Sequence, residues 1–152
     1  MQEPETTQDD FHFRSWLGGF VDGEGCFHIN KYPEFHLTNT DRQVLEYICE
    51  NLKQSRVEAL RDCKVRLSTM GSEKWKSRYK IQVRGRKAVE WAKFLLPFLR
   101  LKTEQANLLI QFPFCNQKPV PHHIMMLREQ QQAKMNQLNA TGPRLQSDGD
   151  CE

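Results

Sequence analysis

The chain has 152 residues, 38% of them hydrophobic and 27% charged, which suffices for one domain with its own core, and no apolar run approaches the roughly 18 residues of a membrane span. Its acidic, polar first ten residues exclude a secretory or transit peptide, so we expect an intracellular protein, in a prokaryotic cytoplasm or an organelle. The net charge of +3 conceals a basic body: residues 11–144 hold 22 basic and 12 acidic side chains, a net charge of +10.

The first half of the chain predicts a helix, two strands and a second helix. Residues 1–10 are expected to be disordered, and apolar positions predict a helix over 13–23. Alternating residues in "CFHINKY" and "FHLTN" predict two strands with the turn at Pro33-Glu34 between them. "TDRQVLEYICENL" is amphipathic and predicts a helix that begins at a capping box formed by Thr40 and Gln43.

The second half repeats the strand-strand-helix pattern and then adds helices. Alternation predicts strands over 58–69 and 77–84. "RKAVEWAKFLL" predicts a helix that begins after Gly85 and ends at Pro97, and "KTEQANLLIQF" predicts another. A Gln-rich helix over about 122–138 precedes a flexible tail, 140–152, so that residues 11–139 form one domain.

The fold class is therefore α+β, in the order α-β-β-α-β-β-α, with one antiparallel four-stranded, saddle-shaped sheet, helices on one face and extra C-terminal helices. The opposite face is polar and basic, and residues 56–87 alone hold eleven basic and three acidic side chains. Such a face suits phosphates and base edges, although a solvated sheet face is the alternative. The candidate DNA-contacting residues are His28, Asn30, Tyr32, His36, Thr38, Arg61, Lys64, Arg66, Ser68, Arg78, Lys80, Gln82 and Arg84.

Cysteine and tryptophan usage suggests packing roles. The five cysteines, an odd number, include no C-x-x-C pair, so we predict neither a zinc site nor a disulfide framework, but reduced and mostly buried thiols. Trp75 and Trp91 are expected to pack in the interior rather than to stack on bases.

"LGGFVDGEG", residues 17–25, accepts two penalties at once, glycines within a helix and acids at its electronegative end. Close packing of this helix against a second copy would offset the first, and a cation shared by two Glu24 carboxylates would offset the second. Asp22 would then cap the partner's helix. The predicted dimer interface comprises Leu17, Gly18, Gly19, Phe20 and Asp22, and the predicted metal ligands are Glu24 and Gly23.

The same stretch resembles the motif of the LAGLIDADG homing endonucleases, single-motif homodimeric type, with Glu24 at the position of the family's metal ligand. "PFLRLKTEQANL", residues 97–108, is similar to the segment with the family's active-site lysine, here Lys102. "FHLTNTDRQVLEYI", residues 35–48, resembles the segment whose polar residue holds active-site water, here Asn39, and Arg42 is a candidate for a second basic residue. The resemblance covers about residues 13–114 and keeps the three segments in order.

The resemblance implies a homodimeric endonuclease that hydrolyses both strands of a long pseudo-palindromic DNA site and leaves short 3′ overhangs. The expected cofactor is Mg²⁺, with Mn²⁺ able to substitute and Ca²⁺ binding without supporting cleavage. Two non-catalytic alternatives stay open: an RNA-binding intron splicing cofactor (maturase) and a DNA-binding repressor. Local alternatives also stay open, namely a surface lysine at Lys102 and an Asx turn at Asn39.

Overall fold

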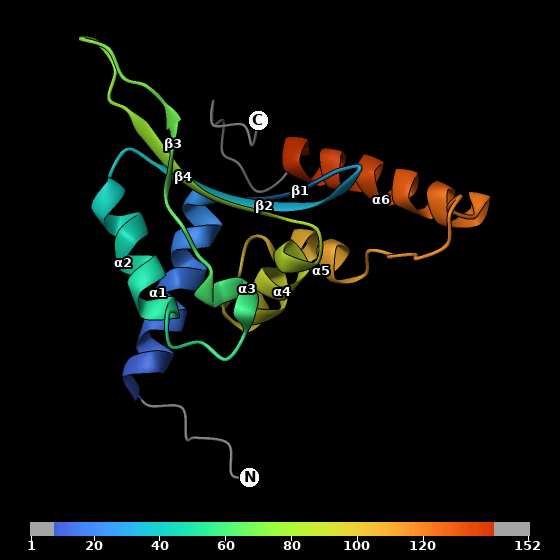
Figure 1. The fold of residues 1–152 in the computed structure, drawn as a ribbon, viewed down its shortest axis with the longest axis horizontal. Helices are drawn as coiled ribbons and strands as arrows, with labels where there is room; N and C mark the ends of the chain where they lie inside the picture. The colour runs from blue at the N-terminus through green and yellow to red at the C-terminus, as the bar shows by residue number, and fades with distance from the viewer. Residues whose placement is uncertain (1–7, 142–152) are drawn as a thin grey trace.

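The computed structural model describes residues 8–141, which form one four-stranded antiparallel sheet and its helices (Figure 1). The order α-β-β-α-β-β-α with C-terminal helices confirms the predicted α+β fold class. No helix in this part of the chain is both long and apolar enough to cross a membrane. The elements are α1 (Gln8–Glu24), β1 (Gly25–Asn30), β2 (Tyr32–Asn39), α2 (Arg42–Leu52), α3 (Glu58–Arg61), β3 (Arg66–Thr69), β4 (Arg78–Arg84), α4 (Arg86–Leu95), the 3₁₀ turn η1 (Leu96–Phe98), α5 (Thr103–Ile110) and α6 (His122–Thr141).

The sheet has the strand order β1-β2-β4-β3, so two hairpins join through β2 and β4. The first hairpin turns at Lys31, which has a φ of 68° and separates the paired residues Asn30 and Tyr32. The predicted turn at Pro33-Glu34 is therefore wrong. Both residues lie inside β2, where Pro33 pairs with Ile29.

Alternation along the strands divides the sheet into the two predicted faces. The apolar positions of β1, β2 and β4 are at most 2% exposed: Phe27, Ile29, Phe35, Leu37 and Ile81. Helices α1 to α5 cover this face, below the sheet in Figure 1. Trp91 of α4 is fully buried as predicted, and its indole ring stacks on Phe35 with 5.1 Å between ring centroids.

The third predicted strand is wrong in its first half, because residues 58–61 form α3. Ala59 and Leu60 are adjacent and both buried, which a two-residue alternation cannot achieve but a helical turn against α4 can. Arg61 consequently lies on this short helix, and Lys64 lies before β3 rather than on it. Trp75 is 75% exposed beyond β3, so its predicted burial is also wrong.

Cys49 of α2 and Cys63, which follows α3, form a disulfide with 5.2 Å between their Cα atoms. The prediction of reduced thiols is wrong for this pair. The contact depends on α3, which folds back against α2 and brings two cysteines 14 residues apart in sequence within bonding range. Cys26 is buried and Cys115 is half-buried, whereas Cys151 lies outside the described residues.

The C-terminal helix α6 lies beside β1, the first strand of the sheet (Figure 1). Asn139 donates a hydrogen bond to the carbonyl oxygen of Phe27 at 3.0 Å, and the Lys31 backbone donates to the Gln132 side chain at 3.4 Å. Met135 is fully buried at this contact. The helix thus protects the edge of the sheet from pairing with another strand. It extends to Thr141, and α1 begins at Gln8, so both are longer than predicted.

Candidate active site and nucleic-acid interface

Glu24 is the last residue of α1 and is exposed where the chain passes into β1. The junction is tight, because a Cβ atom on the buried Gly25 would lie 2.8 Å from Val21 Cγ1 and 2.9 Å from the Val21 carbonyl oxygen. Only glycine fits there, and it fixes where the preceding carboxylate is presented. Within residues 8–141, the Glu24 side chain has no ion-pair partner.

Lys102 reaches the same junction from the segment before α5. Its Nζ donates to the Val21 carbonyl oxygen at 3.3 Å and to the carbonyl oxygen of Gly25. An ammonium group at the electronegative end of a helix is favourable by about 0.3–1 kcal/mol. The structure therefore brings the predicted lysine to the residue next to Glu24, rather than leaving it on an unrelated surface.

Asp22 has an unexpected role within its own chain. Its two carboxylate oxygens accept the backbone N–H groups of Arg100, Leu101 and Lys102 at 2.8–3.1 Å. The expectation that Asp22 caps a partner's helix is wrong, because these donors lie about 80 residues away in the same chain. Asp22 instead holds the segment that carries Lys102 against the end of α1.

Asp22→Ala should lower the free energy of unfolding by about 2–3 kcal/mol, because it leaves three backbone donors without a charged acceptor. Asp41→Ala is the matched control. Asp41 is the N-cap of α2 and accepts two N–H groups, and loss of a cap costs about 1 kcal/mol. Urea denaturation followed by circular dichroism measures both. An Asp22 variant as stable as the Asp41 variant would contradict the three-donor role.

Asn39, at the end of β2, forms the Asx turn that was one of its two interpretations. Its Oδ1 accepts the Asp41 N–H at 2.8 Å, and Asp41 rather than Thr40 caps α2. The predicted capping box is therefore wrong. Arg42 forms an ion pair with Glu46 at 2.8 Å and lies over the Tyr79 ring, so its guanidinium is occupied locally.

The adjacent glycines of α1 have different surroundings. A Cβ on Gly18 would lie 2.3 Å from the Phe98 carbonyl oxygen, so this glycine permits close packing against η1 of the same chain. The expectation that its packing partner must come from a second chain is wrong. Gly19 is exposed, and nothing lies within 4 Å of an added Cβ. Of the other predicted interface residues, Leu17 is fully buried in this chain's core, and Phe20 is half-buried and stacks on Trp16.

A polar hollow lies on the face of the sheet opposite α1 to α5. It brings together seven of the thirteen predicted DNA-contacting residues, along with Glu34 and Thr69. Those seven are His28, His36, Thr38, Ser68, Arg78, Lys80 and Gln82. Arg66 and Arg84 are exposed on β3 and β4, at its margins. The predicted basic reading face therefore exists as one surface.

Some predicted contacts lie away from this hollow or are already engaged. Tyr32 lies beside the Phe112 ring with 6.3 Å between ring centroids, and Asn30 is exposed at the β1–β2 turn. Glu34 accepts from His28 Nε2 at 2.7 Å and pairs with Arg84 at 3.2 Å. This pairing role of Glu34 was not anticipated, because it depends on the β2–β4 register.

The His36 side chain is uncharged near neutral pH. Burial in the sheet, and then the neighbouring charges of His28 and Lys80, lower the pKa of His36 to about 4. A neutral imidazole offers one nitrogen lone pair, and it can act as a hydrogen-bond acceptor or as a metal ligand.

The chain matches no protein-family model, and no curated protein sequence matches it. Two solved structures share its fold with TM-scores of 0.65 and 0.66, each at 21% sequence identity over 96% of this chain and 88% of the other. Both are crystal structures of the homing endonuclease I-CvuI. One is in complex with its target in the presence of calcium, and the other is in complex with the I-CreI target in the presence of magnesium, with the DNA not cleaved. The predicted resemblance is thus confirmed at the level of the fold.

Proposed function

We propose that the chain is a site-specific DNA endonuclease that acts as a homodimer on both strands of a long pseudo-palindromic site. The observation that carries this proposal is Glu24, a carboxylate with no ion-pair partner among residues 8–141, presented at the α1–β1 junction beside Lys102. The fold that holds them is shared with a homing endonuclease solved on DNA. The polar hollow supplies a basic surface for the duplex.

Glu24 and the adjacent Gly23 are the proposed metal ligands, and both are exposed at the end of α1. An oxygen-only donor set suits Mg²⁺, which is usually held by one or two carboxylates, several waters and substrate phosphate. One carboxylate per chain fits that requirement when two chains meet. When bound, a divalent cation lowers the pKa of water and stabilises the leaving oxygen. We expect Mn²⁺ to substitute and Ca²⁺ to support binding without cleavage.

Lys102 and Asn39 have supporting roles in the proposed reaction. The Lys102 ammonium, held by carbonyl oxygens of α1, is positioned to stabilise negative charge that develops on the phosphate. The Asn39 side chain uses its carbonyl oxygen in the Asx turn, which leaves its amide group to orient water. The scheme uses no Ser, Cys or His nucleophile, so water attacks directly and no covalent intermediate forms. We expect the products to carry short 3′ overhangs.

The proposed dimer would pair α1 with α1 of a second copy across Gly19. Nothing in the described part of the chain explains a glycine at this exposed helical position, where glycine costs about 0.5–1 kcal/mol relative to alanine. Close approach of a second helix would explain it. A two-fold axis there would bring two Glu24 residues together and place two polar hollows side by side.

Cleavage of a randomised duplex DNA library tests the proposal. We expect Mg²⁺ to support cleavage of a small set of pseudo-palindromic sequences, and Ca²⁺ to support binding to the same set without cleavage. Specific DNA binding without cleavage in any divalent metal would instead identify a repressor. Preference for structured intron RNA over duplex DNA would identify a maturase.

The polar hollow should separate specificity from affinity. Arg78 lines the hollow, whereas Lys76 lies in the exposed connection between β3 and β4. We expect Arg78→Ala to relax base preference at one position in each half-site, since a bidentate base contact is worth about 1–3 kcal/mol. Lys76→Ala should weaken binding to all sequences alike and reduce the log–log salt slope by about 0.9.

Cleavage of single-base variants of the selected site, scored for both proteins over a range of salt, measures the two effects. The symmetric change in the Arg78 variant is a further check, because a two-fold dimer presents the same side chain to both half-sites. Equal weakening on every sequence by Arg78→Ala would show that this side chain contacts only phosphate.

A further inference from the structure

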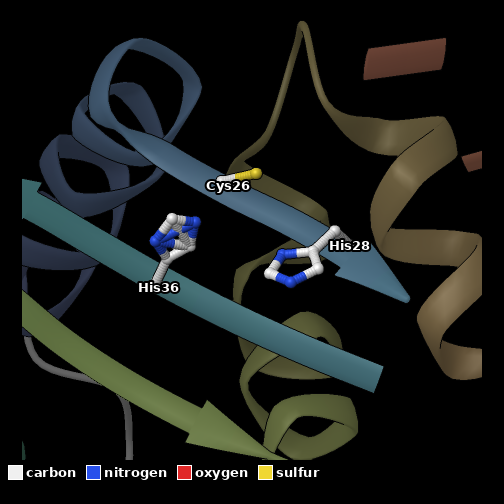
Figure 2. Close-up of side chains that lie close together, drawn as sticks. All are labelled: Cys26, His28 and His36. Carbon is white, nitrogen blue, oxygen red and sulfur yellow. The ribbon is translucent and has the colours of Figure 1, made fainter. Parts of the chain in front are cut away.

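Three metal-binding side chains meet on the polar face of the sheet, separate from Glu24. Cys26 and His28 alternate along β1 and therefore share a face, and His36 of β2 pairs directly with Cys26. Figure 2 shows the side chains arising from these two neighbouring strands and gathering above them. Their candidate ligand atoms, one from each side chain, lie within 4.8 Å of one another.

The two imidazoles each have a buried nitrogen to spare. His28 Nδ1 and His36 Nε2 are inaccessible to solvent and have no hydrogen-bond partner among the described residues. Leaving a buried polar atom unsatisfied costs about 1–3 kcal/mol, so two such atoms beside one thiol call for an explanation. The Cys26 side chain is 2% exposed, and its Sγ makes only a long contact, 3.8 Å, with the Phe27 carbonyl oxygen.

The surroundings prepare the imidazoles for coordination. His28 Nε2 is bonded to the Glu34 carboxylate at 2.7 Å, which leaves Nδ1 as its available nitrogen. A carboxylate hydrogen-bonded to the far nitrogen of a metal-ligating histidine fixes the ring and makes it a better ligand. Burial keeps His36 neutral, because its pKa is lowered to about 4, so its lone pair is available at neutral pH.

We propose that Cys26 Sγ, His28 Nδ1 and His36 Nε2 bind one Zn²⁺ ion per chain, with Glu34 orienting His28. Thiolate and imidazole are ligands that zinc prefers and Mg²⁺ does not, so this site differs in chemistry from the proposed oxygen site at Glu24. Binding replaces the thiol proton, which passes to solvent, and forms the Zn–S bond. The fourth position is left for water or for a group from a bound partner.

Tetrahedral zinc needs only a small contraction of this cluster. With bonds of about 2.0–2.3 Å, ligand atoms lie roughly 3.5 Å apart, so side-chain movements of about 1 Å suffice. Occupancy would take His28 and His36 out of the set of base contacts and add positive charge to the polar hollow. The proposal does not depend on endonuclease activity.

Titration of the reduced, metal-free protein with Co²⁺ in the absence of DNA tests the site. We expect one equivalent per chain, with the thiolate-to-cobalt charge-transfer absorption and the intense visible bands typical of four-coordinate cobalt, displaced by Zn²⁺. Cys26→Ser should abolish the charge-transfer absorption. Cys115→Ser, which changes a half-buried cysteine outside the cluster, is the matched control and should keep it.

Two further variants keep the test decisive if Cys26→Ser folds poorly. His36→Asn should weaken Co²⁺ binding at least tenfold, and Glu34→Gln should weaken it about 10–100-fold without changing the stoichiometry. A wild-type protein that gives no thiolate–cobalt absorption, or a Cys26 or His36 variant that binds as tightly as wild type, overturns the proposal. Tighter binding of Cu(I) than of Zn²⁺ would overturn the choice of metal.

Discussion

Glu24→Gln should reduce DNA cleavage by about 10³-fold or more while leaving the protein folded, dimeric and able to bind its site. The substitution preserves the size of the side chain and removes the one carboxylate that the α1–β1 junction presents without an ion-pair partner among the described residues. Loss of a group that stabilises charge in the transition state costs about 10²–10³-fold, and loss of a metal ligand adds to that cost. DNA binding without metal should be equal or tighter, because a negative charge facing phosphate is removed.

Single-turnover cleavage of the selected duplex, with binding measured in parallel in Ca²⁺-containing and metal-free buffers, separates these effects. Glu129→Gln is the matched control, since it removes an exposed carboxylate from α6, far along the chain from α1. Unchanged turnover in the Glu24 variant would place the active site elsewhere. Joint loss of binding and cleavage would show that Glu24 supports the fold or the dimer instead.

Local sequence patterns were sufficient where the local environment decides the structure. Alternation in β1, β2 and β4 separates a buried face containing Phe35 and Ile81 from a polar one containing His36 and Lys80, because each strand has a single core side. The same rule failed over 58–65. There, Ala59 and Leu60 are buried by contacts with α4 that lie outside the window in which a period can be counted.

The active-site details depend on contacts between distant segments, which no short pattern contains. Asp22 and Gly18 both contact the segment around residues 98–102, so an argument that sought their partners in a second chain overlooked the nearer explanation. The motif nevertheless located Glu24 and Lys102 correctly relative to the end of α1, because each was identified within its own conserved-looking segment. Their proposed catalytic roles stay predictions.

The Cys26–His28–His36 cluster illustrates a second kind of limit. A search for closely spaced cysteines finds nothing, since the ligands come from neighbouring strands and include one thiol only. The sequence does contain the Cys-x-His alternation, but the third residue joins it through the register that pairs Cys26 with His36. That register is set by the single-residue turn at Lys31, which the sequence analysis placed two residues too late.

Gly19→Leu should convert a dimer into a monomer without unfolding it, whereas Gly18→Leu should destabilise the chain itself. An added side chain at Gly19 meets nothing within 4 Å in this chain, and leucine favours a helix over glycine by about 0.8–1.0 kcal/mol, so the monomer should be equally or more stable. In a dimer, the same side chain would separate two α1 helices packed through this position. We expect the dimer dissociation constant to rise at least about 100-fold, which corresponds to roughly 3 kcal/mol.

Gly18 is the internal comparison, because a Cβ there would lie 2.3 Å from the backbone oxygen of Phe98. Overpacking of this kind costs about 1–3 kcal/mol or more, so Gly18→Leu should lower the urea midpoint whatever the oligomeric state. Sedimentation velocity across a micromolar concentration series, together with urea denaturation, distinguishes the two variants. A wild-type chain that sediments as a monomer throughout, or a Gly19→Leu protein that stays dimeric, would refute an α1–α1 interface through Gly19. The pairing of two Glu24 carboxylates would then need another basis.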